Sequence, residues 1–207
     1  KKNKFFGIGK THELLKKITD LQIESARHSN PLTLLPGNIA INQEIQECID
    51  SKKAFHIAYL DLNNFKPFND YYGYSRGDEV IKKTAELMTS KIGKNDFIGH
   101  VGGDDFILML FDKNWKRICE AISHEFIQLK DSFYDQEDLR NGFIPGKDRH
   151  GNICQFELLG LAIGISHPDL EQVKSFHQVA NLCSDAKNEA KKLKDSYIFI
   201  NQRRTSK

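Results

Sequence analysis

Two short apolar segments are separated by Gly102-Gly103-Asp104-Asp105, and this junction constrains the fold more than any other part of the chain. The flanking segments, residues 96–101 and 106–111, have the length and apolar content of β-strands. Glycine readily adopts the positive φ angles that a tight hairpin turn requires. We therefore predict a β-hairpin with Asp104 and Asp105 at its tip.

Helical and strand patterns alternate along the rest of the chain. Apolar residues at helical spacing predict helices at residues 11–28, 39–49, 77–91, 115–130 and 171–194, with Asn38 as the cap of the second. Apolar segments predict strands at residues 54–60, 156–165 and 197–200. Residues 61–76 are polar and predict a loop, and the Gly/Pro-rich residues 141–152 predict an exposed loop or a hairpin. This order indicates an α+β fold with helices around a central sheet.

Composition limits the class of protein. The chain has 207 residues, of which 39% are hydrophobic, which is enough for one substantial domain with a core and excludes a disordered chain. No apolar run approaches the roughly 18 residues that a membrane span needs. The net charge of +2 is too small to indicate nucleic acid as a partner.

The cysteines and the first residue bear on the setting of the chain. Cys48, Cys119, Cys154 and Cys183 are far apart and form no Cys-x-x-Cys pair, so we expect buried thiols in a reducing cytoplasm. The first residue is Lys rather than Met, and we expect a piece of a longer protein. The amphipathic segment at residues 11–28 either links an upstream domain to this one or packs on its own domain.

Carboxylates mark the expected site. Asp61 follows a predicted strand, and Asp104 and Asp105 lie at the predicted hairpin tip. If the strands are neighbours, these carboxylates converge and repel one another unless a cation neutralises them. Hard oxygen ligands suit Mg²⁺, which also binds substrate phosphates. The alternative is that Asp61 caps the following segment and that the other two only make a turn soluble.

Polar residues beside the carboxylates suggest a nucleotide. The segment after Asp61 is rich in amide side chains and backbone donors, and Lys66 adds positive charge, so it could hold phosphate. Asn69 and Asp78 offer donors and acceptors that could read a base edge. The alternative is that these residues form turns through their own backbone hydrogen bonds. The lysines at 187, 191, 192 and 194 form either a solvated face or a contact to a triphosphate.

Several blocks of residues together resemble a known family. Asp61–Lys66, Asn69-Asp70, Gly73, Gly77–Glu79 and Gly102–Phe106 are similar to the GGDEF domain of diguanylate cyclases. Weaker similarity is carried by Asn30–Pro36, Ala162–Ile165 and Ala190-Lys191. The resemblance covers about residues 30–200. The residues within these motifs are similar to those of GGDEF domains found beside EAL phosphodiesterase domains in bacterial signalling proteins.

The resemblance implies a fold and a reaction. The fold would be a mostly antiparallel sheet flanked by helices, like the palm of nucleotidyl cyclases and polymerases, with an N-terminal linker helix at residues 1–29 and the GGDEF domain at residues 30–207. The reaction would join two GTP molecules into cyclic di-GMP with release of pyrophosphate, using Mg²⁺ or Mn²⁺. Each chain would hold one GTP, so activity would need a homodimer. A regulatory or EAL domain would be attached in the full-length protein.

The resemblance also implies residue roles. Asp61 and the carbonyl of Leu62 would bind the metal, and Asp104 would be its second carboxylate. Asp105 would act at the metal or activate the attacking hydroxyl. Guanine would be held by Asn69 and Asp78, and phosphates by Asn64, Phe65, Lys66 and Lys191.

The sequence departs from the family pattern at several positions, and three of these departures support an alternative function. Asp105 stands in place of Glu, Asn63 in place of Asp, and Asp195 in place of a phosphate-binding Arg. The product-inhibition motif lacks its Arg and is Gly93-Lys94-Asn95-Asp96, so we expect no feedback inhibition there. The alternative is a degenerate GGDEF module that binds GTP and regulates an attached domain without catalysis.

Overall fold

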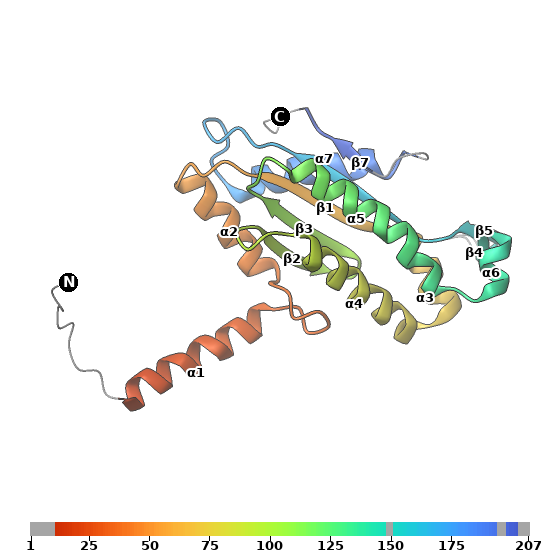
Figure 1. Cartoon of the computed structure of the whole chain (residues 1–207), viewed down its shortest axis with the longest axis horizontal. Helices are drawn as coiled ribbons and strands as arrows, with labels where there is room; N and C mark the ends of the chain where they lie inside the picture. The colour runs from red at the N-terminus through yellow and green to blue at the C-terminus, as the bar shows by residue number, and fades with distance from the viewer. Residues whose placement is uncertain (1–10, 148–150, 194–197, 203–207) are drawn as a thin grey trace.

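A five-stranded sheet in the order β2-β3-β1-β6-β7 forms the centre of the structure (Figure 1). The structure is a computed structural model that describes residues 11–147, 151–193 and 198–202. The strands are β1 (His56–Asn63), β2 (Phe97–Gly102), β3 (Asp105–Leu110), β6 (Gly160–Ser166) and β7 (Ile198–Ile200). Neighbouring strands are antiparallel except β6 and β7, which are parallel. The predicted α+β class and the mostly antiparallel sheet are therefore confirmed.

Helices cover both faces of the sheet. One face packs against α3 (Phe65–Tyr72), α4 (Tyr74–Lys91) and α5 (Trp115–Lys130), and the other packs against α2 (Asn38–Asp50) and α7 (Phe176–Ala190). Figure 1 shows α4 and α5 in front of the sheet and α7 behind it.

Side chains alternate along β1 between these two faces. Ala58, Leu60 and Leu62 belong to the core on the α4 and α5 side, whereas Ile57 and Tyr59 belong to the core beneath α2 and α7. By the same alternation, Asp61 lies on the α7 face. Strand β1 therefore places a carboxylate at the end of a row of side chains that is otherwise apolar on this face.

Gly164 sets the distance between α7 and the sheet. A Cβ atom placed on Gly164 would lie 2.3 Å from the backbone nitrogen of Lys187 and 2.4 Å from the carbonyl carbon of Ala186. Only glycine permits this approach, since the obstacle is helix backbone rather than a movable side chain. Gly164 pairs with Tyr59 across β1 and β6, so α7 crosses the sheet directly beside Tyr59.

The first helix stands apart from the sheet. Helix α1 (Thr11–His28) has the predicted bounds and projects away from the domain (Figure 1). Leu14, Leu15 and Ile18 are 60%, 57% and 43% exposed. This part of α1 therefore does not bury its apolar residues on its own domain.

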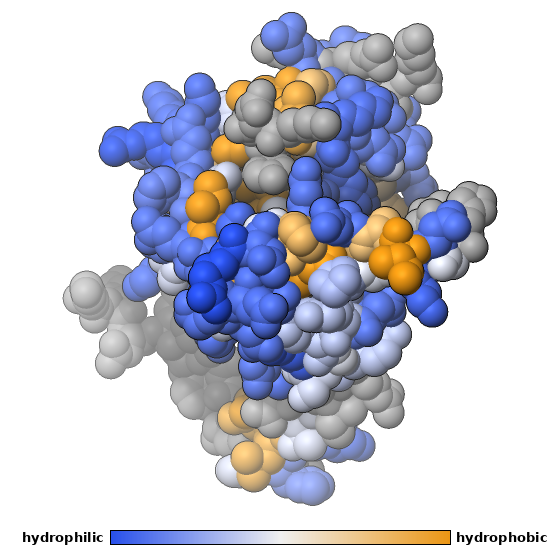
Figure 2. All heavy atoms as spheres, turned by 90° about the vertical axis from the view of Figure 1, so that its right-hand side faces the viewer, coloured by the Kyte–Doolittle hydropathy of each residue, from blue (hydrophilic) through white to orange (hydrophobic). Residues whose placement is uncertain are grey.

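A small subdomain lies at the end of the molecule that is far from the first residue of β1. It consists of α6 (Gln136–Asn141) and the antiparallel hairpin of β4 (Phe143–Lys147) and β5 (Ile153–Glu157). Figure 2 faces this end and shows a mostly hydrophilic surface with separate hydrophobic residues, and Ile153 is 84% exposed. Of the two structures predicted for residues 141–152, the hairpin is the one observed.

The prediction of a loop at residues 61–76 is wrong. Strand β1 continues through Asp61 to Asn63, and helix α3 begins at Phe65. The many polar residues concealed an apolar helical stripe, in which Phe68 is fully buried and contacts Tyr72. Gly73, with φ +88°, separates α3 from α4, and α4 begins at Tyr74 rather than Gly77.

Three smaller predictions also need correction. Asn38 is not a helix cap, because Gly37 occupies that position and Asn38 donates its side-chain amide to the Val101 carbonyl at 3.1 Å. The predicted strand at 156–165 is interrupted between β5 and β6. Helix α7 begins at Phe176, after a turn at residues 169–173, and ends at Ala190. Residue 194, the predicted end of that helix, lies outside the described residues.

The four cysteines are free thiols. Cys48, Cys119 and Cys183 are buried, as predicted, and Cys154 is half-buried. In the described ranges, the structure contains no helix that is both long and apolar enough to cross a membrane.

Candidate functional site

Asp61 and Asp105 form a cross-strand pair at one end of β1 and β3. Both lie on the sheet face that α7 covers, and Asp61 is only 4% exposed. Burial raises the pKa of Asp61 to about 6; Asp105 and Asp104 add to this rise, whereas Lys191 opposes it. The fold therefore holds a buried carboxylate and a half-buried carboxylate side by side.

Lys187 of α7 and Lys191, the C-cap residue that follows α7, face this carboxylate pair. Lys191 Nζ lies 2.6 Å from Asp61 Oδ1, as an ion pair without hydrogen-bond alignment. Lys187 Nζ lies 3.1 Å from Asp105 Oδ1 and 3.5 Å from Asp61 Oδ2. Lysines four residues apart share one side of a helix, which explains why both reach the same pair.

The environment of Lys187 favours its charged form. Burial lowers the pKa of Lys187, but the hydrogen bond to Asp105 and the nearby Tyr59 and Asp61 reverse this, and the net pKa is raised. Its ammonium also lies 4.4 Å from the centroid of the Tyr59 ring. The site therefore combines anionic oxygens with two protein cations.

Asp104 lies in the tight turn that joins β2 and β3. Gly102 and Gly103 have φ angles of +147° and +57°, so the predicted use of glycine in this turn is confirmed. The pKa of Asp104 is raised, first by burial and then by Asp105. All three predicted carboxylates are thus close enough to influence one another.

The side chain of His100 contacts the turn between β2 and β3. Its ring stacks on Phe106 with centroids 4.3 Å apart, Nε2 lies 3.0 Å from the Gly103 carbonyl, and Nδ1 lies 2.9 Å from Thr33 Oγ1. In the neutral ring, Nε2 donates to Gly103 and Nδ1 accepts from Thr33. Burial lowers the pKa of His100 despite the nearby carboxylates. His100 was not among the predicted site residues.

This environment predicts a pH-dependent stability. Because the folded-state pKa of His100 lies below 6.5, the unfolded chain binds more protons just below that pH, and stability falls as the pH falls. We expect His100→Gln to be less stable than the natural chain by about 1–3 kcal/mol at pH 7.5, since buried partners lose their hydrogen bonds. Between pH 7.5 and pH 5.5, the stability of His100→Gln should fall less than the stability of the natural chain.

Urea unfolding at the two pH values measures this effect. His177→Gln changes an exposed histidine and serves as the control. Burial also lowers the pKa of His56, which adds to the fall in stability, whereas the raised pKa of Asp61 opposes it, so the test is the difference in pH dependence between His100→Gln and the natural chain. Equal drops in His100→Gln and in the natural chain would contradict the prediction.

The start of α3 supplies backbone donors immediately after β1. Asn64 adopts the left-handed conformation, with φ 61°, and precedes the helix. The first helical hydrogen bond runs from the amide of Phe68 to the Asn64 carbonyl, so the amides of Phe65 and Lys66 have no partner within the helix. The Lys66 side chain is exposed. These three predicted phosphate-binding residues therefore share one helix N-terminus.

Asn69 and Asp78 lie on either side of the contact between α3 and α4. A Cβ atom on Gly77 would lie 1.8 Å from Asn69 Oδ1, so glycine at 77 allows Asn69 to approach α4. Asn69 Oδ1 is buried and has no hydrogen-bond partner within the described part of the chain. Asp78 is exposed. The structure thus brings the two predicted base-binding residues to one place and leaves an acceptor unsatisfied there.

The donor set fits a divalent cation in its chemistry. The carboxylates of Asp61, Asp104 and Asp105 are hard oxygen ligands, whereas the Leu62 side chain belongs to the core on the opposite face, so only its carbonyl could contribute. Among the described residues, however, no three His, Cys, Asp or Glu side chains are gathered as a metal cluster. Lys187 and Lys191 supply the positive charge beside Asp61 instead.

The structure describes some of the remaining predicted features but not all of them. Asp96 uses both carboxylate oxygens locally, because they accept from the amides of Gly93 at 2.8 Å and Phe111 at 2.9 Å. Residues 194 and 195 lie outside the described residues, so the departure at Asp195 stays an observation of sequence. Lys187 was predicted only as part of a basic cluster, and its spacing from Lys191 was the available signal.

The sheet topology and the acidic hairpin define the class of the domain: it is an α+β domain in which two strands each carry an acidic residue at the same end, opposite one another. Among known proteins, the family described as "Diguanylate cyclase, GGDEF domain" matches residues 27–141, which is more than half of the chain. The chain belongs to this family, as the sequence resemblance predicted.

Individual relatives agree with this assignment. The chain is 35% identical over 92 residues to the bifunctional diguanylate cyclase/cyclic di-GMP phosphodiesterase MucR of Pseudomonas aeruginosa. The match covers 42% of this chain and 13% of MucR, so the chain spans a small part of that relative.

Solved structures show the same fold. The coiled coil and GGDEF domain of DgcB from Caulobacter crescentus has a TM-score of 0.68 and 19% identity, over 92% of this chain and 95% of that one. The S helix-GGDEF-EAL structure of LapD from Vibrio cholerae has a TM-score of 0.65 and 14% identity, over 95% and 43%. At these identities the likeness establishes the fold alone.

Proposed function

We propose that this chain is a diguanylate cyclase domain that joins two GTP molecules into cyclic di-GMP. The observation that carries the proposal is the cross-strand pair of the buried Asp61 and the half-buried Asp105 beside Asp104, one short turn of chain from the α3 N-terminus. Acidic oxygens and free backbone amides are the groups that a metal-bound triphosphate requires. Family membership supports the same assignment.

Each predicted residue has a role in this proposal. The amides of Phe65 and Lys66, which follow the left-handed Asn64, hold phosphate oxygens together with the ammonium groups of Lys66 and Lys191. Asn69 and Asp78 hydrogen-bond guanine, which gives the buried Asn69 Oδ1 a donor. Specific binding thus orients the α-phosphate toward the carboxylates.

In this proposal, the carboxylates bind the metal and accept a proton at the reaction centre. Asp61, Asp104 and the Leu62 carbonyl would hold Mg²⁺ or Mn²⁺, and Asp105 assists at the metal or accepts the proton of the attacking ribose 3′-hydroxyl. A bound divalent ion would offset charge on the phosphates and lower the pKa of that hydroxyl. The in-line attack breaks the α–β phosphoanhydride bond and releases pyrophosphate. Two chains must meet, because each supplies one GTP.

The wider setting is part of the same proposal. Residues 1–29 link this domain to an upstream one, and residues 30–207 form the GGDEF domain. The exposed Leu14, Leu15 and Ile18 on the projecting α1 support the linker role. We place the domain in the cytoplasm, where GTP is available, with a regulatory or EAL domain attached in the full-length protein.

A second candidate function has its own support. Lys187 already neutralises Asp105 and Asp61, and Asp105 is shorter than the family's usual Glu. A domain of this kind could bind GTP and regulate an attached domain without catalysis.

A product assay distinguishes the two functions. Purified protein, tested at high concentration so that dimers form, is incubated with GTP and Mg²⁺ or Mn²⁺. Cyclic di-GMP that disappears in Asp104→Ala supports the cyclase. GTP binding without product supports the regulatory module, and absence of GTP binding refutes both.

A further inference from the structure

The Lys187 ammonium occupies the space that two carboxylates share. It lies 3.1 Å from Asp105 Oδ1 and 3.5 Å from Asp61 Oδ2, and its side chain is 18% exposed. A single cation thus bridges a β1 carboxylate and a β3 carboxylate. This is the position in which a metal ion would neutralise the same pair.

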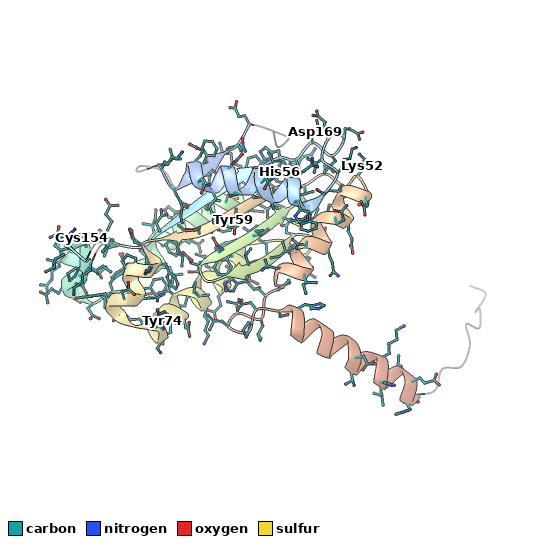
Figure 3. The ribbon with its side chains drawn as sticks, turned by 180° about the vertical axis from the view of Figure 1, so that it is seen from behind. Lys52, His56, Tyr59, Tyr74, Cys154 and Asp169 are labelled. Atoms are coloured by element: carbon teal, nitrogen blue, oxygen red, sulfur yellow. The ribbon has the colours of Figure 1, made fainter. Side chains whose placement is uncertain are left out.

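The backbone holds Lys187 in this position. Gly164 allows α7 to approach the sheet at Lys187 itself, and the flanking Ala186 and Ala190 are fully buried. The Lys187 side chain then passes over the Tyr59 ring, and Figure 3, seen from the α7 side, shows Tyr59 close to that helix. Lys187 is therefore aimed at the carboxylates by the packing of the helix.

The neighbouring lysines are held less firmly. The Lys191 side chain is 39% exposed and reaches Asp61 alone. The Lys192 side chain is 68% exposed and pairs with Glu189 at 2.6 Å, away from the carboxylates. Among these three lysines, Lys187 is the one that bridges both acids.

We propose that Lys187 is a built-in counter-ion that competes with divalent metal for Asp61 and Asp105 and thereby weakens metal binding. The inference rests on the proposed metal-binding role of those carboxylates. Mg²⁺ approaches carboxylate oxygens to about 2.0–2.1 Å, and an ammonium group on the same oxygens would repel any divalent ion. Metal binding therefore requires Lys187 Nζ to leave Asp105, and the free energy of that displacement reduces the apparent affinity.

Mn²⁺ titration without nucleotide tests the proposal. Free Mn²⁺ is measured by electron paramagnetic resonance at fixed ionic strength. We expect Lys187→Met to bind Mn²⁺ about tenfold more tightly than the natural chain, a change within the range of close charge-pair couplings. Lys187→Arg keeps the charge and should retain weak binding. Lys192→Met makes the same change of net charge on an exposed residue and should leave affinity unchanged.

Each outcome decides the proposal. Equal affinity in Lys187→Met and the natural chain, or no Mn²⁺ binding by Lys187→Met, overturns it. Tighter binding that persists in Asp61→Asn/Lys187→Met also overturns it, because the ion would then lie elsewhere. If Lys187→Met does not fold, Lys187→Gln provides the same comparison. Because no GTP is present, a failed cyclase assay leaves this result intact, so the two proposals fail separately.

Discussion

Asp61→Asn is expected to reduce cyclic di-GMP formation at least about a hundredfold while the domain stays folded. The amide has nearly the same shape but no negative charge, so the site loses its most buried anionic ligand. Stability should change by less than about 1 kcal/mol, because loss of the ion pair with Lys191 is offset by no longer burying a carboxylate. Product formation by chromatography and thermal unfolding measure the two effects.

A matched variant separates the local effect from overall charge. Asp185→Asn makes the same change of charge at an exposed position of α7 and should retain activity. If Asp61→Asn keeps more than half of the natural turnover, Asp61 does not act in the reaction. Asp61→Asn should also lose most Mn²⁺ binding, which gives a second measurement independent of turnover.

Gly164→Ala is expected to destabilise the domain by about 3 kcal/mol, the upper part of the range for added volume in a packed core. The added methyl would meet the backbone of Ala186 and Lys187 at 2.3–2.4 Å, so α7 must move as a unit. For a chain of this size, such a loss lowers the melting temperature by roughly 10 °C. Differential scanning calorimetry measures the shift.

The β4–β5 hairpin contains a glycine that provides a matched control for Gly164→Ala. A Cβ atom on Gly146, in β4, would meet the Phe156 ring at 2.7 Å, which is a side chain that can turn aside. Gly146→Ala should therefore cost less than about 1 kcal/mol. If the two alanine variants have the same melting temperature, close approach of α7 is not what Gly164 provides.

The acidic pair could be predicted from sequence because it depends on strand ends alone. Asp61 follows an apolar segment, and Asp104 and Asp105 follow two glycines between apolar segments, so pairing of the two strands brings Asp61 and Asp105 together. The family resemblance added the roles of Asn69 and Asp78, which no periodicity indicates. The approach of Asn69 to Gly77, next to Asp78, depends on how α3 meets α4, and the polar composition of α3 concealed that helix.

The role of Lys187 could not be predicted for a different reason. Helical spacing places Lys187 and Lys191 on one side of α7, but it does not say which side faces the sheet. That orientation follows from tertiary packing at Gly164 and Tyr59. A basic helix on the surface and a basic helix over an acidic pair have the same sequence pattern.

The two signs of charge at this site rest on different parts of the fold. Asp61 and Asp105 belong to strands joined directly by backbone hydrogen bonds, so their separation is fixed by the sheet itself. The two cations belong to α7 and to its C-cap, and this helix is not part of the strand pairing of the sheet but packs on it. Any displacement of this helix would therefore move both cations together, whereas the separation of the two anions would stay fixed by the sheet.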